Sequence, residues 1–144
     1  MKKMSCGVII TNGTVILMLH VTKKSHWDIP KGQKEENETN IEAALRELQE
    51  ESGVILLPEQ LIPLGTISYN KEKDLSLFLY YTDILPQKDN MECSSYVNIA
   101  NQISFPEIDG YKYMTWEEAI NNTSKSLSSK LDNIKNMVNL IIQT

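Results

Sequence analysis

The alternation of hydrophobic and polar positions predicts a chain that starts with a β-hairpin. Residues 5–10 and 15–21 are rich in β-branched and apolar side chains, and Asn12-Gly13 lies between them. Asn-Gly between two such runs is a strong signal for a tight turn. Further strands are predicted at 63–69, 75–84 and 111–114.

Two segments lack a strand period. Trp27 to Gly32 contains a proline and a glycine and is predicted to be a turn region rather than a regular element. Residues 86–105 are predicted to form a long irregular loop.

Helical periodicity appears in mid-chain and near the end. Thr39 followed by Glu42 is a capping box, and Gly53 suits a left-handed helix end. Thr115 and Glu118 predict a second capping box. The last helix is predicted over 126–142.

These elements predict an α/β (α+β) fold, a mixed β-sheet between helices, with helices on both faces. The length of 144 residues suits a single domain, 1–144.

Composition narrows the choice of function. No apolar run approaches the roughly 20 residues that span a bilayer, so no membrane association is expected. The formal net charge of −5 argues against broad nucleic-acid binding. Cys6 and Cys93 have no disulfide or metal-knuckle spacing, which favours a reducing, cytoplasmic location.

The mid-chain helix carries several closely spaced acidic residues. Glu47, Glu50 and Glu51 gather on one arc at the flank of the buried face, where like charges repel. This leaves two alternatives, a solvated surface or a site for a hard divalent cation, which prefers carboxylate oxygens. Arg46 is placed to orient Glu47.

The string from Gly32 to Val54 resembles the Nudix box, G-x5-E-x7-R-E-U-x-E-E-x-G-U, where U is aliphatic. Gly32 is followed after five residues by Glu38, and seven more lead to Arg46-Glu47-Leu48, Glu50-Glu51 and Gly53-Val54. Every defined position is met. The chain is identified as a member of the Nudix hydrolase family, whose fold is an αβα sandwich.

The resemblance implies hydrolysis of a nucleoside diphosphate linked to another group, with Mg²⁺ or Mn²⁺ as cofactor. Carried over by position, Glu47, Glu50, Glu51 and the backbone carbonyl of Lys31 bind metal. Arg46 orients Glu47. Gly32, Glu38 and Gly53 complete the structural part of the box.

The catalytic set is expected to comprise Glu47, Arg46, Glu50 and Glu107. The general base is either a glutamate of the box or a later one, and Glu107 lies just before the last strand, where several family members place such a residue. Glu92 is a weaker candidate, and solvated loop acids are the alternative for both.

Substrate contacts are expected at Lys31, Trp27 and Tyr81. Lys31 precedes the box and either contacts a substrate phosphate or is simply solvated. Trp27 packs under the loop or borders a nucleotide, and Tyr81 is either structural or a stacking face for a base. The W-x-x-P-K-G flank is similar to that of diadenosine-polyphosphate hydrolases and RNA 5′-pyrophosphohydrolases.

The expected substrate is therefore a dinucleoside polyphosphate or a triphosphorylated RNA 5′ end. The alternatives are a (d)NTP pyrophosphohydrolase that cleans the nucleotide pool and, in another class, a non-catalytic Nudix-fold nucleotide-binding module. Both monomer and homodimer are left open.

Overall fold

The computed structural model describes residues 2–100 and 103–143. The strands are β1 (Lys3–Thr11), β2 (Val15–Val21), β3 (Trp27–Asp28), β4 (Lys31–Gln33), β5 (Ile62–Ser68), β6 (Lys73–Tyr81), β7 (Tyr96–Ile99), β8 (Ile103–Pro106) and β9 (Ile108–Thr115). The helices are α1 (Asn40–Ser52), α2 (Trp116–Asn122) and α3 (Lys125–Ile142), with 3₁₀ turns η1 (Pro58–Gln60) and η2 (Lys88–Asn90).

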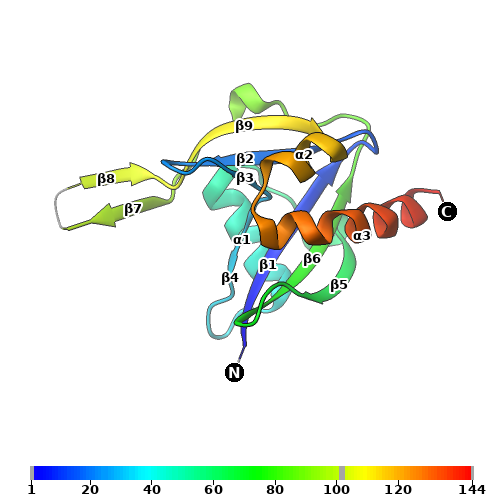
Figure 1. The fold of residues 1–144 in the computed structure, drawn as a ribbon, viewed down its shortest axis with the longest axis horizontal. Coiled ribbons are helices and arrows are strands. Elements are labelled where there is room, and N and C mark those ends of the chain that lie inside the picture. The colour runs from blue at the N-terminus through cyan, green and yellow to red at the C-terminus, as the bar shows by residue number, and fades with distance from the viewer. Residues whose placement is uncertain (1, 101–102, 144) are drawn as a thin grey trace.

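A mixed sheet forms the centre of the molecule (Figure 1). Its strand order is β3-β2-β1-β6-β5, and β1 and β6 run parallel along their whole length, from Lys3↔Lys73 to Thr11↔Tyr81. β9 pairs with β2, and β4 pairs with β1. The remaining two strands, β7 and β8, form a separate hairpin.

The first hairpin opens into a fork. β1 and β2 pair only near their turn, at Thr11↔Ile16. Beyond that point they diverge, β3 pairs with β2, and β4 pairs with β1. The fork places the segment from Trp27 to Gln33 between the two strands, beside α1.

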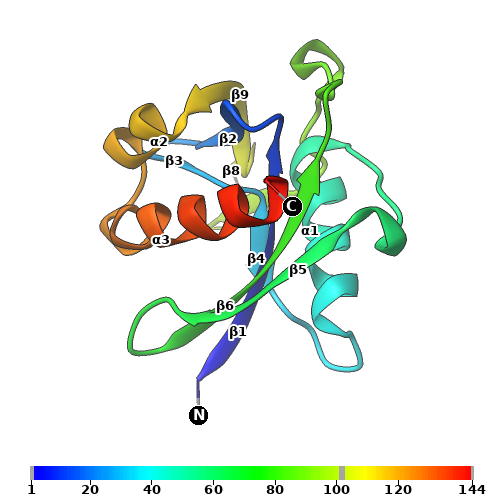
Figure 2. The same cartoon turned by 90° about the vertical axis from the view of Figure 1, so that its right-hand side faces the viewer.

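Helices cover both faces of the sheet, as Figure 2 shows with α1 on one side and α3 on the other. Alternate residues of the strands supply the two cores. Leu17, Leu19 and Leu48 belong to the core under α1, whereas Met18 and Leu131 belong to the core under α2 and α3. The expected mixed sheet between helices is confirmed.

Four predictions of secondary structure require correction. Residues 86–105 are not wholly irregular, since they contain η2, β7 and most of β8 (residues 101–102 lie outside the described part). The segment after Trp27 contains the short strands β3 and β4, because the fork gives each a pairing partner. The strand predicted at 111–114 extends over Ile108–Thr115, and that predicted at 75–84 ends at Tyr81.

Candidate active site

Helix α1 begins and ends at the residues that the sequence predicts. The Thr39 side chain accepts a hydrogen bond from the Glu42 N–H, and Glu42 accepts one from the Thr39 N–H. Gly53 ends the helix at φ 78°, in the left-handed region. The two caps fix the last turns of α1, which carry Glu47, Glu50 and Glu51.

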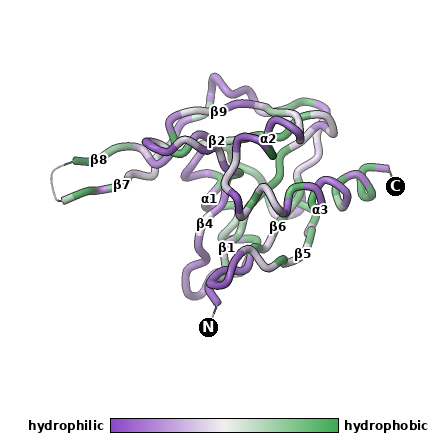
Figure 3. Tube along the Cα trace, in the orientation of Figure 1, coloured by the Kyte–Doolittle hydropathy of each residue, from purple (hydrophilic) through white to green (hydrophobic). Residues whose placement is uncertain are grey.

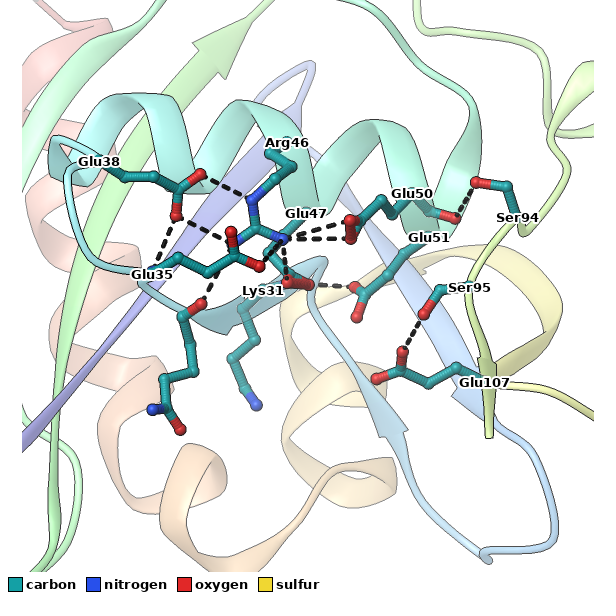
Figure 4. Close-up of polar contacts among 11 residues, drawn as sticks. Lys31, Glu35, Glu38, Arg46, Glu47, Glu50, Glu51, Ser94, Ser95 and Glu107 are labelled. Carbon is teal, nitrogen blue, oxygen red and sulfur yellow. Dashed lines mark hydrogen bonds and ion pairs between the residues drawn. The ribbon is translucent and has the colours of Figure 1, made fainter. Parts of the chain in front are cut away.

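Arg46 connects the acidic residues to the preceding loop (Figure 4). Its Nε and Nη2 donate to the two carboxylate oxygens of Glu38 at 2.6 and 3.0 Å. Its Nη1 donates to Glu47 at 2.9 Å and to Glu50 at 3.1 Å. One guanidinium therefore orients two carboxylates while a third holds it in place, and the hydrogen bond from Arg46 lowers the pKa of Glu38.

Glu47 packs directly against the backbone of Gly32. A Cβ on Gly32 would overlap the Glu47 carboxylate. Burial raises the pKa of Glu47 to about 7, and the nearby charges of Glu50 and Glu107 act in the same direction, while Arg46 opposes them. The carboxylate is thus held in a partly dehydrated position beside β4.

Glu51 is almost fully buried, at 4% exposure. Its Oε1 accepts a hydrogen bond from the Lys31 N–H at 3.1 Å, and its backbone carbonyl accepts one from the Tyr111 hydroxyl at 2.5 Å. Burial raises its pKa well above the ordinary value, and the charges of Glu107 and Glu47 add to the effect. A buried carboxylate with like charges nearby is costly unless a cation compensates it.

The side chain of Lys31 lies close to Asp28, with Nζ 2.9 Å from the carboxylate and 5.4 Å from the centre of the Tyr69 ring. Burial alone lowers a lysine pKa, but Asp28 and Tyr69 outweigh it and raise the pKa of Lys31. Lys31 is therefore a fixed positive charge, and Asp28, which holds it, is a residue that sequence reasoning missed.

Glu107 approaches the helix from the start of β9. Its carboxylate accepts a hydrogen bond from the Ser95 Oγ at 2.8 Å, and its N–H donates to the Ser95 carbonyl at 2.8 Å. Ser94 in turn donates its N–H to the carbonyl of Glu50. Segment 94–95 thus links Glu107 to the end of α1, a tertiary contact with no signal in the sequence. Glu92, the weaker candidate for the base, is exposed, and its backbone N–H donates to the carbonyl of Ser52, the last residue of α1.

A hollow of about 140 Å³, the acidic pocket, is lined by four of the residues described above: Asp28, Lys31, Glu51 and Glu107. Its lining residues are Val21, His26, Asp28, Ile29, Lys31, Glu51, Glu107 and Ile108. Lys31, Glu51 and Glu107, which come from three separate segments, therefore share one cavity.

The donor set around this pocket fits a hard divalent cation. The candidate ligands are the carboxylates of Glu47, Glu50 and Glu51 and one backbone carbonyl, all oxygen donors, and a buried carboxylate such as Glu51 is of the kind that such an ion compensates. Within residues 2–100 and 103–143, no three His, Cys, Asp or Glu side chains are already arranged as a metal-binding group. Arg46 instead holds Glu47 and Glu50, so both would have to turn toward the ion.

Trp27 and Tyr81, the other two expected substrate contacts, do not line this pocket. Trp27 packs against the core under α3 and also lines a shallow pocket of about 380 Å³ with His20, Asp109 and Gly110. Its ring meets His20 edge-on at 5.1 Å. Tyr81 lies at the far end of β6, where a Cβ on Gly13 would be 3.7 Å from its ring. The fold does not bring Tyr81 to the acidic residues.

Comparison with known proteins gives a consistent result. A family model described as NUDIX domain matches residues 1–133. An uncharacterized 17.7 kDa protein of Enterobacteria phage T4 is 34% identical over 122 residues, which cover 77% of this chain and 81% of that protein.

Two further proteins are more distant. An mRNA-decapping protein of African swine fever virus is 26% identical over 104 residues, but the match spans only 42% of that protein's length and 66% of this chain. The crystal structure of a C. elegans Ap4A hydrolase binary complex has a TM-score of 0.63 at 20% identity, covering 94% of this chain and 97% of that one. At that identity, the likeness shows the fold alone.

Proposed function

Because the chain belongs to the NUDIX domain family and is a hydrolase of that family, we propose that it is a Mg²⁺- or Mn²⁺-dependent pyrophosphohydrolase. Its substrate is a nucleoside diphosphate linked to another group, namely a dinucleoside polyphosphate or a triphosphorylated RNA 5′ end. The proposed catalytic domain is the single domain 1–144, and the proposed location of the protein is the cytoplasm.

The observation that carries this proposal is the arrangement of the last turns of α1 against β4. Arg46 orients Glu47 and Glu50, Gly32 leaves room for Glu47, and Glu51 is buried in the last turn of the same helix. This is the geometry that supports Glu47, Glu50 and Glu51, with the backbone carbonyl of Lys31, as the residues that hold the cation. A divalent ion held by these residues would neutralise phosphate oxygens and lower the pKa of a water.

The other side chains bind substrate and move the proton. Lys31, fixed by Asp28, pairs with a phosphate oxygen of the substrate. Glu107 accepts a proton from the attacking water, whose oxygen bonds to phosphorus while the bond from phosphorus to the departing phosphate breaks. The hydrogen bond from Ser95 aims one oxygen of Glu107 and leaves the other for the water.

Trp27 supplies the contact for one nucleoside. Gly110, which has no side chain, lines the same pocket, and a Cβ atom at this position would be 3.2 Å from the Cβ atom of His20. The missing side chain leaves the Trp27 and His20 rings accessible. The remote position of Tyr81 gives it no support as a second contact.

The experiment is a comparison of kcat/KM for diadenosine tetraphosphate, a 5′-triphosphorylated RNA, nucleoside triphosphates and ADP-ribose, with Mg²⁺ present. Diadenosine tetraphosphate or the RNA is expected to lead. A lead for nucleoside triphosphates would favour the pool-cleaning alternative, and no turnover of any substrate would favour a binding module.

Glu50→Gln tests the metal assignment, with Glu36→Gln on the exposed loop as the matched control. We expect Glu50→Gln to lower kcat by about 10³-fold or more while the circular dichroism spectrum is unchanged. Equal activity of the two variants would contradict the assignment.

A further inference from the structure

The strands β7 and β8 form an arm that projects from the body of the molecule, as Figure 1 shows. They pair in register, Val97 with Phe105 and Ile99 with Ile103. Directly paired residues, and residues two apart, point to the same face of a hairpin. One face of the arm is therefore apolar, and Tyr96 lies on the opposite face.

This apolar face is exposed. Val97 is 37% exposed, Ile99 47% and Ile103 57%, and the same strands include hydrophobic stretches in Figure 3. Residues 94–106 contain no charged side chain. An apolar surface held away from the core in this way is typical of a binding surface.

A groove of about 490 Å³ runs between the arm and the loop that follows β2. The lining residues of this arm groove are Val21, Thr22, Lys23, Lys24, Val97, Ile99, Phe105 and Glu107. Its volume is within the range that holds a small organic ligand.

One of the two lysine side chains of the groove lies over its aromatic residue. The Nζ of Lys23 is 4.6 Å from the centre of the Phe105 ring, and Lys24 follows it in the chain. The groove thus combines an apolar wall with two positive charges and one negative charge, Glu107. A ligand with a flat apolar part and an anionic part matches this combination, whereas an apolar peptide would supply no counter-charge for the two exposed ammonium groups.

The arm groove adjoins the acidic pocket. Val21 and Glu107 line both cavities. A ligand that reacts beside Glu107 can therefore extend into the groove without leaving the surface.

We propose that the arm groove binds the second nucleoside of the substrate, on the far side of the scissile anhydride from the nucleoside at Trp27. The base packs against Val97 and Phe105, and Lys23 and Lys24 pair with the adjoining phosphates. This inference rests on the proposed function and deepens it, because it selects substrates with a base at both ends of the phosphate chain.

Binding without turnover tests the groove separately from catalysis. Calorimetry in EDTA compares diadenosine tetraphosphate with ATP on the wild type, Phe105→Ala and Lys23→Gln. We expect both variants to weaken binding of diadenosine tetraphosphate by about tenfold and to leave ATP binding within about twofold of the wild type. Tyr96→Ala, an aromatic removed from the opposite face of the same arm, is the matched control and should change neither affinity.

Kinetics and sedimentation complete the test. In Mg²⁺, the same two variants should lower kcat/KM for diadenosine tetraphosphate and leave that for ATP unchanged. If the wild type hydrolyses nothing but the selective loss of affinity persists, the proposed function fails and the groove stands. Equal effects on both nucleotides, or none, would overturn the groove.

Two other occupants would also be revealed. A loss confined to a 5′-triphosphorylated RNA trinucleotide would assign the groove to an RNA chain and overturn the second-nucleoside proposal. A change of sedimentation coefficient in Phe105→Ala, absent in Tyr96→Ala, would identify the arm as a contact between copies and overturn it equally.

Discussion

A Cβ atom on Gly32 would overlap the carboxylate of Glu47, so the two residues lie together only because position 32 has no side chain. In Gly32→Ala the Glu47 side chain must turn away. Because the overlap involves the flexible end of a side chain, we expect the free energy of unfolding to change by about 1 kcal/mol or less. Glu47 is one of the proposed metal ligands, and displacing such a carboxylate by an ångström should lower kcat by about 10²-fold. Urea unfolding and steady-state kinetics measure the two effects.

Gln33→Ala is the control, since it changes the adjacent, exposed side chain and keeps the backbone carbonyl that accepts from Arg46. A variant Gly32→Ala with full activity would show that Glu47 does not need its observed position.

The pairing of Glu38 with Arg46 predicts how stability depends on pH. The folded-state pKa of Glu38 is below its ordinary value of 4.5, chiefly because Arg46 donates to its carboxylate. Between those two pKa values the unfolded chain binds more protons, so stability rises with pH through this window. Glu38→Gln should therefore be less stable than the wild type at pH 7, and the difference should shrink as the pH falls below about 4.5.

Urea unfolding from pH 3 to pH 7 measures this difference, and Glu59→Gln on the exposed turn η1 serves as the control. A difference between Glu38→Gln and the wild type that stays constant across the whole range would mean that the ion pair does not set the pKa.

Burial of Glu51 predicts opposite effects of one substitution with and without metal. Glu51→Gln removes a buried charge, and the amide oxygen can still accept from the Lys31 N–H. In EDTA the variant should be as stable as the wild type or more so, by about 1–2 kcal/mol. Added Mg²⁺ or Mn²⁺ should raise the Tm of the wild type by mass action and leave that of Glu51→Gln unchanged.

Differential scanning fluorimetry across a metal titration measures the Tm of each protein without metal and its rise as metal is added. An equal metal-dependent rise in Tm for the two proteins would remove Glu51 from the set of metal ligands.

Local sequence signals predicted the parts of the fold that local interactions determine. The turn at Asn12-Gly13 and the capping boxes at Thr39 and Thr115 are built by neighbouring residues, and all three are present. The arm was missed although Val97, Ile99, Ile103 and Phe105 alternate with other residues. Its strands are short and mostly exposed, so the burial that usually accompanies such a pattern is weak.

The candidate site shows the same division. The residues of the Nudix box were predicted because their spacing fixes them to one helix and its loop. The pairing of Asp28 with Lys31 and of Ser95 with Glu107 depends on how the fork and β9 meet α1. Tyr81 was selected as an aromatic side chain, and only the sheet topology shows that its end of β6 lies beside Gly13.

The two cysteines should differ sharply in reactivity. Cys6 has no exposed surface, and burial raises the pKa of its thiol to about 11, so at pH 8 only about 0.1% of it is the reactive thiolate. Cys93, whose chain neighbours bond to the last turn of α1, is half-buried. Iodoacetamide at pH 8 should therefore alkylate Cys93 first, by a factor of about 10² or more, as peptide mass spectrometry will show. In urea it should alkylate both cysteines equally.

The raised pKa of the Cys6 thiol also makes stability depend on pH. Between pH 9 and 11 the folded thiol keeps its proton while the unfolded one loses it, so the free energy of unfolding should fall as the pH rises through this window. Cys6→Ala should lack that decline, while Cys93→Ala should retain it. Native alkylation of Cys6 at the rate of Cys93 would contradict the buried position of β1 in the centre of the sheet.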